Sequence, residues 1–445
     1  MPEIAPGPQG DPWLGNLRAF RRDVLGLMLD GARAHGDVVR FRLGPMVAHL
    51  VNDPALVTQV LQTRARHYDK QTRSTAAIRA ICGESLLTAN DRAWETRRRL
   101  IQPAFHRHRV GQLVDTMATC IAARLSTWRV GAPIDVASEM MRLTFVIAGK
   151  AILGADVSAE SASVEHAIAF MLERAYARWG RVAPVPAWVP SPEHLRFRLA
   201  RAGLDRIVGR IVAEHRASPP AQADLLTMLM EARDTGPGTG LTSAGFSDGE
   251  LRNEAITMLL AGHETTATAL SWTFALLAAH PDAAARVRAE VHQVVGARTP
   301  TLDDLPRLTF TTQVIQESMR LYPPIWAIER RAVSDDVLGG FAIPAGSSVI
   351  ISPYVLHRHP RFWADPERFD PSRFDGPKPS PAYLPFGAGP RYCVGSEFAM
   401  VEARLVVAMV TQAFQLTLLP GHIVAPHPSL TLRLRHGLHM TLDAH

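Results

Sequence analysis

A short glycine-rich segment late in the chain carries the residue types best suited to bind a metal. It reads Phe386-Gly-Ala-Gly-Pro-Arg-Tyr-Cys-Val-Gly395 and contains one of the three cysteines in the 445 residues. Cys393 lies shortly before an amphipathic stretch that begins at Ser396, and the free N–H groups and dipole of a helix N-terminus favour negative charge. We therefore expect the Cys393 thiol to lose its proton readily and to serve as a metal ligand.

The residues around Cys393 suit a flat, anionic ligand. Gly387, Gly389 and Gly395 permit positive φ angles and a close approach of the backbone. Arg391 supplies a fixed cation. Each feature also has a plain structural interpretation, because a lone cysteine can be a small buried hydrophobe and a glycine-rich turn before a helix can cradle a phosphate.

The longest apolar segment, residues 249–279, predicts a second part of the site. Ser247 and Asp248 form a plausible N-cap for a helix there. Arg252 and Glu254 are among the charged residues that interrupt its apolar character. These charges favour a helix buried in a large domain over a membrane span.

Polar side chains stand in the middle of this helix, in the run Ala-Gly-His-Glu-Thr-Thr that begins at Ala261. Ala261 and Gly262 are small enough to let a ligand approach the backbone. Thr265 can bond to the carbonyl four residues earlier. Glu264 beside a hydroxyl costs free energy in an apolar helix unless it has a partner or a function. A polar patch satisfied by water is the alternative interpretation.

Two further pairs are weaker signals when each is taken alone. Trp94 and Arg98 share a helix face, because they are four residues apart, and a surface helix with a half-buried Trp would look the same. Glu317 and Arg320 also share a face, and most such pairs are surface contacts that contribute less than about 1 kcal/mol. Arg368 follows in an extended Asp/Pro-rich segment.

The elements that must position these residues follow from the periodicity of the chain. Val38–Leu43 and Val47–Val51 alternate and predict a β-hairpin around Gly44 and Pro45. Helical spacing dominates elsewhere, whereas residues 63–87 and the Gly/Ser/Thr-rich residues 235–247 suggest loops.

The composition narrows the function classes. The chain is 47% hydrophobic and 20% charged, which suits a globular protein with a large core. Its net charge of +6 comes without a basic tail or finger motif, so we expect no nucleic-acid partner. Three cysteines suggest no disulfide framework and a cytoplasmic location. The N-terminus has no apolar run, so we expect no membrane anchor.

Taken together, the motifs resemble those of the cytochrome P450 superfamily, soluble bacterial type, in identity, order and spacing. The pattern Phe-x-x-Gly-x-Arg-x-Cys-x-Gly is similar to its haem-binding loop, and the resemblance extends over almost the whole chain. It implies a mainly α fold with a small β lobe (α+β), in which a long central helix lies over the haem and the cysteine loop lies beneath it. We expect one domain over residues 1–445, with a β-rich lobe at 36–62 plus 325–360.

The resemblance also implies individual roles. Cys393 would be the axial thiolate ligand of the iron in haem b. The other haem-binding residues would be Trp94, Arg98, Ala261, Gly262, Arg330, His357, Phe386, Arg391 and Gly395, with Arg331 or Arg358 as alternatives to Arg330 and His357. Glu264 and Thr265 would be catalytic, delivering protons. Glu317, Arg320 and Arg368 would form a structural triad.

The implied reaction is the insertion of one atom of O2 into an apolar organic molecule, by hydroxylation or epoxidation, as in secondary metabolism. The expected substrate pocket contains Met258, Ala261, Ile325, Trp326, Ala327 and Leu430, with parts of residues 70–87 and 165–200. Because these side chains are mostly apolar or small, we expect a fatty acid, terpenoid, steroid or macrolide, and we expect Trp326 to narrow the pocket.

No segment remains for a flavin or an iron–sulfur cluster, so electrons from NAD(P)H would arrive through a ferredoxin and a ferredoxin reductase. These partners would dock on the cysteine side, where a basic face could include Arg97, Arg99, Arg107 and Arg109. Two alternatives are a haem-thiolate enzyme that uses peroxide or rearranges its substrate, and a haem-based sensor. Relatives of the peroxide type tend to lose the acid–threonine pair, which this chain keeps.

Overall fold

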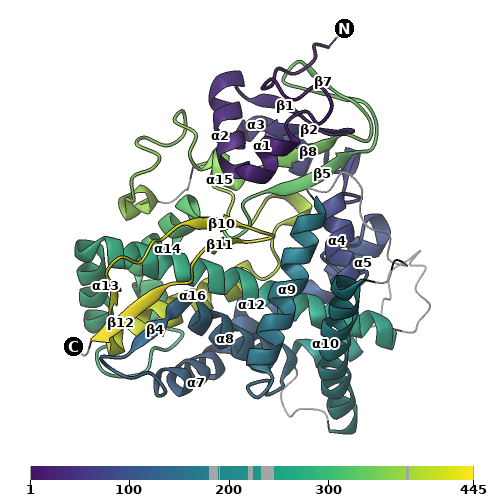
Figure 1. Ribbon diagram of the computed structural model, residues 1–445. Coiled ribbons are helices and arrows are strands. Elements are labelled where there is room, and N and C mark those ends of the chain that lie inside the picture. The colour runs from purple at the N-terminus through teal and green to yellow at the C-terminus, as the bar shows by residue number, and fades with distance from the viewer. Residues whose placement is uncertain are drawn as a thin grey trace.

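The arrangement of helices and strands is seen in a computed structural model, which describes residues 2–179, 189, 191–218, 224–231, 245–376 and 380–443. Figure 1 shows a β-rich part at the N-terminal end and a larger helical part below it, with α12 (Asp248–Ala279) crossing the middle. The expected mainly helical fold with small sheets is therefore confirmed.

Helices make up most of the described chain. The remaining α-helices are α1 (Leu17–Arg22), α2 (Val24–His35), α3 (Pro54–Thr58), α4 (Arg73–Cys82), α5 (Asp91–Ile101), α6 (Arg107–Gly111), α7 (Val114–Leu125), α8 (Val136–Ile147), α9 (Ser161–Trp179), α10 (Pro192–Ala217), α11 (Leu225–Glu231), α13 (Pro281–Val294), α14 (Thr309–Leu321), α15 (Pro353–Leu356) and α16 (Ser396–Ala413). π-Helical turns follow α3 at Gln59–Thr63 and α8 at Ala148–Ile152.

The strands form small sheets. The largest has the order β1-β2-β8-β5-β3. Its strands are β1 (Val38–Leu43), β2 (Met46–Val51), β8 (Ser348–Ile351), β5 (Ile328–Ala332) and β3 (Tyr68–Asp69). The others are β6 (Asp336–Leu338) with β7 (Phe341–Ile343), β10 (Pro426–Pro428) with β11 (Leu432–Leu434), and β4 (Pro133–Asp135) and β9 (Gln415–Leu418) on either side of β12 (His439–Asp443).

The expected hairpin is present, and its register follows from burial. β1 pairs antiparallel with β2, so that Phe41 lies opposite Ala48. Gly44 adopts a φ of +66° in the turn, a conformation that suits glycine. β5 and β8 extend this sheet from a distant part of the chain, and β5 carries Arg330 to the site described below.

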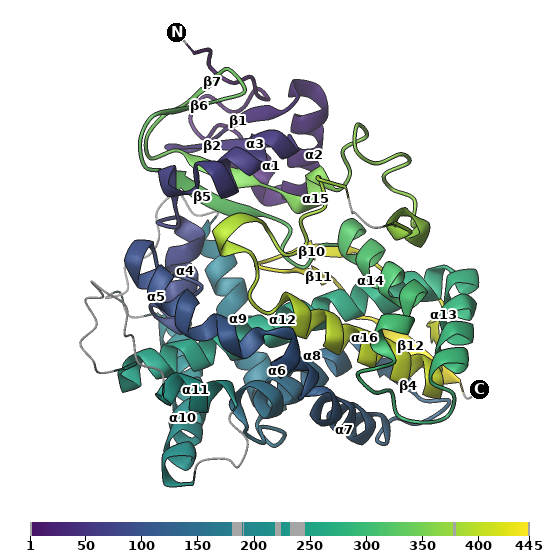
Figure 2. The same cartoon turned by 180° about the vertical axis from the view of Figure 1, so that it is seen from behind.

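α12 is the longest helix and the one that places the polar residues of the second motif. It begins at a capping box in which the Ser247 side chain and the Glu250 side chain satisfy each other's backbone N–H groups. Its residues from Glu254 to Leu277 are buried except at three positions. Figure 2 shows α16 running beside α12, and the two helices are in contact.

One expected loop needs correction, and two other expected regions lie partly outside the described residues. Residues 63–87 are not irregular throughout, because α4 forms within them after Thr72 accepts a hydrogen bond from the Thr75 N–H. Residues 235–244 of the expected loop 235–247 lie outside the described residues. The same holds for residues 180–188 and 190 of the expected pocket region 165–200. No helix in the described ranges has the length and apolar character needed to span a bilayer.

Candidate active site

The cysteine loop is held in shape by its own backbone and by a neighbouring turn. The Cys393 N–H donates to the Phe386 carbonyl at 3.0 Å. Gly387 and Gly389 have φ angles of +72° and +71°, as expected. A Cβ at Gly389 would lie 1.9 Å from the Leu61 carbonyl oxygen, so only glycine fits. The loop therefore places Cys393 just before α16, where the residue is accessible from one side although protein surrounds its thiol on the others.

Two expectations about this loop are wrong. Gly395 has a φ of −91° rather than a positive value, because it serves as the N-cap of α16. The pKa of the Cys393 thiol is raised rather than lowered, since burial by the surrounding protein outweighs the Gly395 N–H and the charge of Arg98. A bound metal ion would reverse this, because a coordinated thiol is deprotonated.

An open strip interrupts the otherwise buried part of α12. Ala261 is exposed, and Gly262 and Thr265 are half-buried, whereas the other residues from Glu254 to Leu277 are buried. These three positions lie on one side of a helix, because their spacing is one, three or four residues. The Thr265 hydroxyl donates to the Ala261 carbonyl at 2.7 Å, as expected. The strip thus exposes two small residues and one hydroxyl.

Gly262 also has a packing role that the sequence did not reveal. A Cβ there would lie 3.1 Å from the Ile152 side chain and 3.6 Å from that of Ala148. The neighbouring His263 is buried against Phe145, with ring centroids 5.6 Å apart. Burial lowers the pKa of His263 to about 4, so this side chain is neutral near pH 7.

Glu264 lies next to the open strip but has close partners of its own. Arg433 donates to both carboxylate oxygens at 2.6 Å, and the Thr431 hydroxyl donates at 2.6 Å. Burial acts to raise the pKa of Glu264, but the charge and hydrogen bonds of Arg433 oppose it and the pKa ends below its usual value. Arg433 and Thr431 were missed in the sequence because they lie far away in it.

Cations gather around the cysteine loop. Arg391 stacks over the Trp94 ring at 4.4 Å, and Arg98 donates to the Tyr392 carbonyl at 2.8 Å. Arg330 on β5 is buried, and its pKa is lowered to about 10, first by burial and then by the charge of Arg391. The expected residues Trp94, Arg98, Arg330 and Arg391 therefore do come together.

Lys70 joins this cluster, although no motif in the sequence pointed to it. Its pKa is lowered by burial and then by the charges of Arg330 and Arg391. The described hydrogen bonds of the three cations go to neutral acceptors, namely Leu87 O, Glu329 O and Asn90 Oδ1. The carboxylates of Glu329, Asp69 and Asp91 act on the two arginines through their charge without a described hydrogen bond to either guanidinium. Packed cations whose described hydrogen bonds go to neutral acceptors suit an anionic ligand, and the carboxylates of haem fit this requirement.

His357 does not belong to this cluster. Its Nδ1 donates to the Arg320 carbonyl at 3.0 Å, and its Nε2 accepts from the Leu384 N–H at 2.8 Å. The ring is fully buried, and burial lowers its pKa to about 3. With both nitrogens committed to backbone groups, His357 braces the fold and cannot hold a haem carboxylate. This expectation was wrong.

The structural triad has a different third member from the one expected. Arg320 forms a buried bidentate pair with Glu317, at 2.6 and 2.8 Å, as expected. The side chain of Arg368 is exposed, and only its backbone carbonyl takes part, as an acceptor for Arg320. The second guanidinium near Glu317 belongs to Arg373, with its Nε 3.4 Å from the carboxylate. Arg373 lies in a second Pro-x-Arg-Phe sequence, five residues after the first.

The expected pocket residues divide into two groups. Ala261, Ile325, Ala327 and Leu430 are exposed or half-buried, whereas Met258 and Trp326 are buried. The Trp326 side chain packs in the core under the large sheet, and its indole N–H donates to the Ser429 carbonyl at 2.8 Å. The expectation that it narrows a pocket is therefore wrong.

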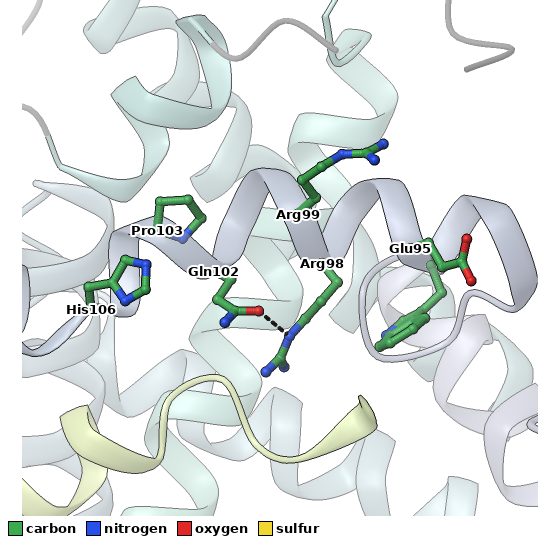
Figure 3. A pocket seen from close by; sticks show the side chains of 7 residues that line it. Glu95, Arg98, Arg99, Gln102, Pro103 and His106 are labelled. Atoms are coloured by element: carbon green, nitrogen blue, oxygen red, sulfur yellow. Dashed lines mark hydrogen bonds between the residues drawn. The ribbon is translucent and has the colours of Figure 1, made fainter. Parts of the chain in front are cut away.

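A shallow depression lies along α5, with a volume of about 380 Å³. Its lining residues are Trp94, Glu95, Arg98, Arg99, Gln102, Pro103 and His106. Figure 3 shows Arg98 and Gln102 pointing toward the ribbon that carries the cysteine loop, whereas Arg99 points the opposite way. Arg97 is not on this surface, because it is buried in ion pairs with Glu250 and Glu254. This corrects its expected place on a docking face.

Known proteins are similar to this chain in sequence. The family described as Cytochrome P450 matches residues 5–437. Cyclooctatin synthase of Streptomyces melanosporofaciens is 36% identical over 96% of this chain and 93% of that protein. Pentalenene oxygenase of Streptomyces avermitilis is 32% identical over 98% of this chain and 96% of that protein.

A solved structure agrees in fold. The crystal structure of the cytochrome P450DA heme domain superposes with a TM-score of 0.87, at 24% identity, over 100% of this chain and 98% of that one. This match spans both the β-rich part and the helical part described above. The chain belongs to the cytochrome P450 family, and it is a monooxygenase of that family.

Proposed function

We propose that this monooxygenase oxidises an apolar terpenoid and that Cys393 holds the haem b on which the reaction depends. The observation that carries the proposal is the open strip on α12, which presents two small residues and the Thr265 hydroxyl. A strip of this kind can accept an apolar molecule while offering one group that handles protons.

Names of relatives support the terpenoid class. Besides the two proteins above, Cyclooctat-9-en-7-ol 5-monooxygenase of Streptomyces melanosporofaciens is 36% identical over 93% of this chain. The pocket residues that remain after the correction above, Ala261, Ile325, Ala327 and Leu430, are apolar. Such a lining favours a molecule with a large hydrocarbon surface.

Haem, when bound, supplies the redox chemistry that activates dioxygen. Cys393 is its thiolate ligand in this proposal, and Phe386 packs near the cysteine sulfur. Arg98, Arg330, Arg391, Trp94 and Lys70 neutralise and orient its carboxylates. Ala261, Gly262 and Gly395 leave room for its ring.

Thr265 and Glu264 handle protons on the α12 side. The Thr265 hydroxyl points into the open strip, where it can hold a water molecule or pass a proton at its Oγ1 atom. Glu264 is the neighbouring ionised carboxylate, and it exchanges protons with groups in the protein interior. Ile325, Ala327 and Leu430 contact the substrate and exclude water from it.

Electrons come from NAD(P)H through a ferredoxin and its reductase in this proposal. The ferredoxin docks over the depression on α5, which Arg99 helps to line, and over the neighbouring α6, where Arg107 and Arg109 are exposed and cationic. Acidic patches on a ferredoxin would be steered to this side, which lies next to the cysteine loop.

An optical titration of the ferric protein tests the substrate class. Terpenoid hydrocarbons and alcohols should produce a low-spin to high-spin shift, and fatty acids, steroids and macrolides should produce little. A shift only with one of the other three classes would refute the terpenoid assignment. A purified protein that retains no haem would refute the role of Cys393.

Turnover with a surrogate ferredoxin and reductase tests the electron route. Product and NAD(P)H consumption should rise together, and peroxide alone should be a poor substitute. Arg99→Glu, Arg107→Glu and Arg109→Glu should each raise KM for the ferredoxin, whereas the matched Arg22→Glu on α1 should not. Equal effects at Arg22 would refute the docking surface.

A further inference from the structure

Glu264 is held by the terminal hairpin, which is formed by β10, β11 and the turn between them. Arg433 on β11 donates from two nitrogens to the two carboxylate oxygens at 2.6 Å. Thr431 in the turn donates to Oε1 at 2.6 Å. These contacts link Glu264 on α12 to residues that follow it by 167 and 169 positions in the chain. Every described hydrogen bond to the Glu264 carboxylate therefore comes from this hairpin.

The hairpin is itself anchored at both sides of its turn. Trp272 on α12 donates from its indole N–H to the Leu432 carbonyl at 2.7 Å. Trp326 donates to the Ser429 carbonyl at 2.8 Å. Leu430, a remaining pocket residue, is half-buried in the turn and stands directly before Thr431. This anchored turn therefore carries both Leu430, which contacts the substrate in the proposed function, and Thr431, which donates to the Glu264 carboxylate.

We propose that Arg433 is a positioning residue that keeps Glu264 ionised and directed at the hairpin, so that proton delivery beside Thr265 depends on how the hairpin is seated. A substrate that presses on Leu430 then acts on Glu264 through Thr431 and Arg433. This inference rests on the proposed role of Glu264, and it adds a residue to which the sequence analysis assigned no role.

Electrostatics support this assignment. Burial favours the neutral form of Glu264, and Arg433 is the largest influence that opposes it. The adjacent His263 is neutral near pH 7, so it cannot replace that charge. Arg433 faces His427 across the hairpin, and Glu173 also acts on His427. Without Arg433, the pKa of Glu264 should rise above its usual value.

The first test compares Arg433→Gln with Arg433→Lys in the haem-loaded protein. Arg433→Gln should reduce product formed per NAD(P)H by about tenfold near neutral pH, within the range expected for a proton-transfer group. The acid limb of its pH profile should move to higher pH, because Glu264 stays protonated longer. Arg433→Lys should bring the acid limb of the pH profile most of the way back to its wild-type position, since lysine again places a cation beside Glu264.

The second readout does not require turnover. In the wild type, the lowered pKa of Glu264 contributes stability above the unfolded carboxyl pKa of about 4.3. In Arg433→Gln, a raised pKa instead penalises folding as the carboxyl ionises at higher pH. The difference between the two proteins in the free energy of unfolding, measured in urea, should therefore widen between about pH 5 and pH 8. Arg435→Gln, an exposed charge change on the same segment, should show no widening.

A double variant separates action through Glu264 from a purely structural role. Glu264→Gln combined with Arg433→Gln should match Glu264→Gln alone in product per NAD(P)H, and it removes the unpaired charge if Arg433→Gln alone folds poorly. An unmoved acid limb together with a constant difference in the free energy of unfolding would overturn the inference but leave the proposed function standing. If Glu264→Gln alone formed as much product per NAD(P)H as the wild type, both this inference and the proposed role of Glu264 would be overturned.

Discussion

Replacing Arg373 and Arg368 in turn tests which arginine completes the cluster around Glu317. Glu317 is fully buried and keeps its bidentate pair with Arg320 in both variants. The Arg373 side chain is 13% exposed, lies 3.4 Å from the carboxylate and donates to the Asp365 carbonyl at 2.9 Å. Arg368 offers only its backbone carbonyl, which any residue would retain.

The expected change in the free energy of unfolding follows from the contacts that each substitution removes. Arg373→Gln removes one short contact to a buried carboxylate and one hydrogen bond, so it should lower the free energy of unfolding by about 1–3 kcal/mol. Arg368→Gln should change it by less than about 0.5 kcal/mol, as for an ordinary surface substitution. Arg320→Gln should cost about 3–5 kcal/mol, because it leaves Glu317 buried without its main partner.

Urea unfolding at equilibrium, followed by circular dichroism and by haem absorbance, measures these differences as shifts in the midpoint at constant slope. Thermal unfolding is a weaker assay here. An unfolding entropy of about 2.1 cal/mol/K per residue means that 1 kcal/mol shifts the Tm by only about 1 °C in a chain of 445 residues. A cost for Arg368→Gln equal to or above that for Arg373→Gln would refute the assignment.

Four other substitutions test the site. Trp326→Ala should destabilise the fold by about 3–5 kcal/mol in urea unfolding and leave ligand preference in optical titration unchanged, because the side chain is buried in the core. Ala327→Leu, at a half-buried neighbour, should instead weaken binding of the larger ligands in that titration. Gly389→Ala should reduce haem content in the purified protein, since its Cβ would lie 1.9 Å from the Leu61 carbonyl oxygen at a φ of +71°. Lys70→Gln should raise the rate of haem transfer to apomyoglobin about tenfold, because one cation leaves the cluster.

Local features were predictable because their causes lie within a few residues. The hairpin at β1 and β2 follows from alternation and a glycine turn. The start of α12 follows from its capping box. The cysteine loop, with Arg391 two residues before Cys393, carries enough fixed residue types to indicate the family and hence the fold. The β-rich and helical parts then followed from that resemblance.

Errors arose where a residue's role depends on distant neighbours. The sequence alone could not tell whether Arg368 or Arg373 meets Glu317, because both occur in similar short segments. Nor could it show that both ring nitrogens of His357 form hydrogen bonds with backbone groups. The helix N-terminus suggested a low pKa for Cys393, but the protein packed around the thiol has the larger effect.

The sequence by itself determined the cysteine loop, the polar residues of α12 and the family, because these depend on residue type and short-range spacing. Only the tertiary structure decided that Arg433 and Thr431 hold Glu264 and that Lys70 joins the cation cluster. Charges interact through space, and burial sets their strength. Neither the separation of two side chains across the fold nor the protein around them is written in the local order of residues.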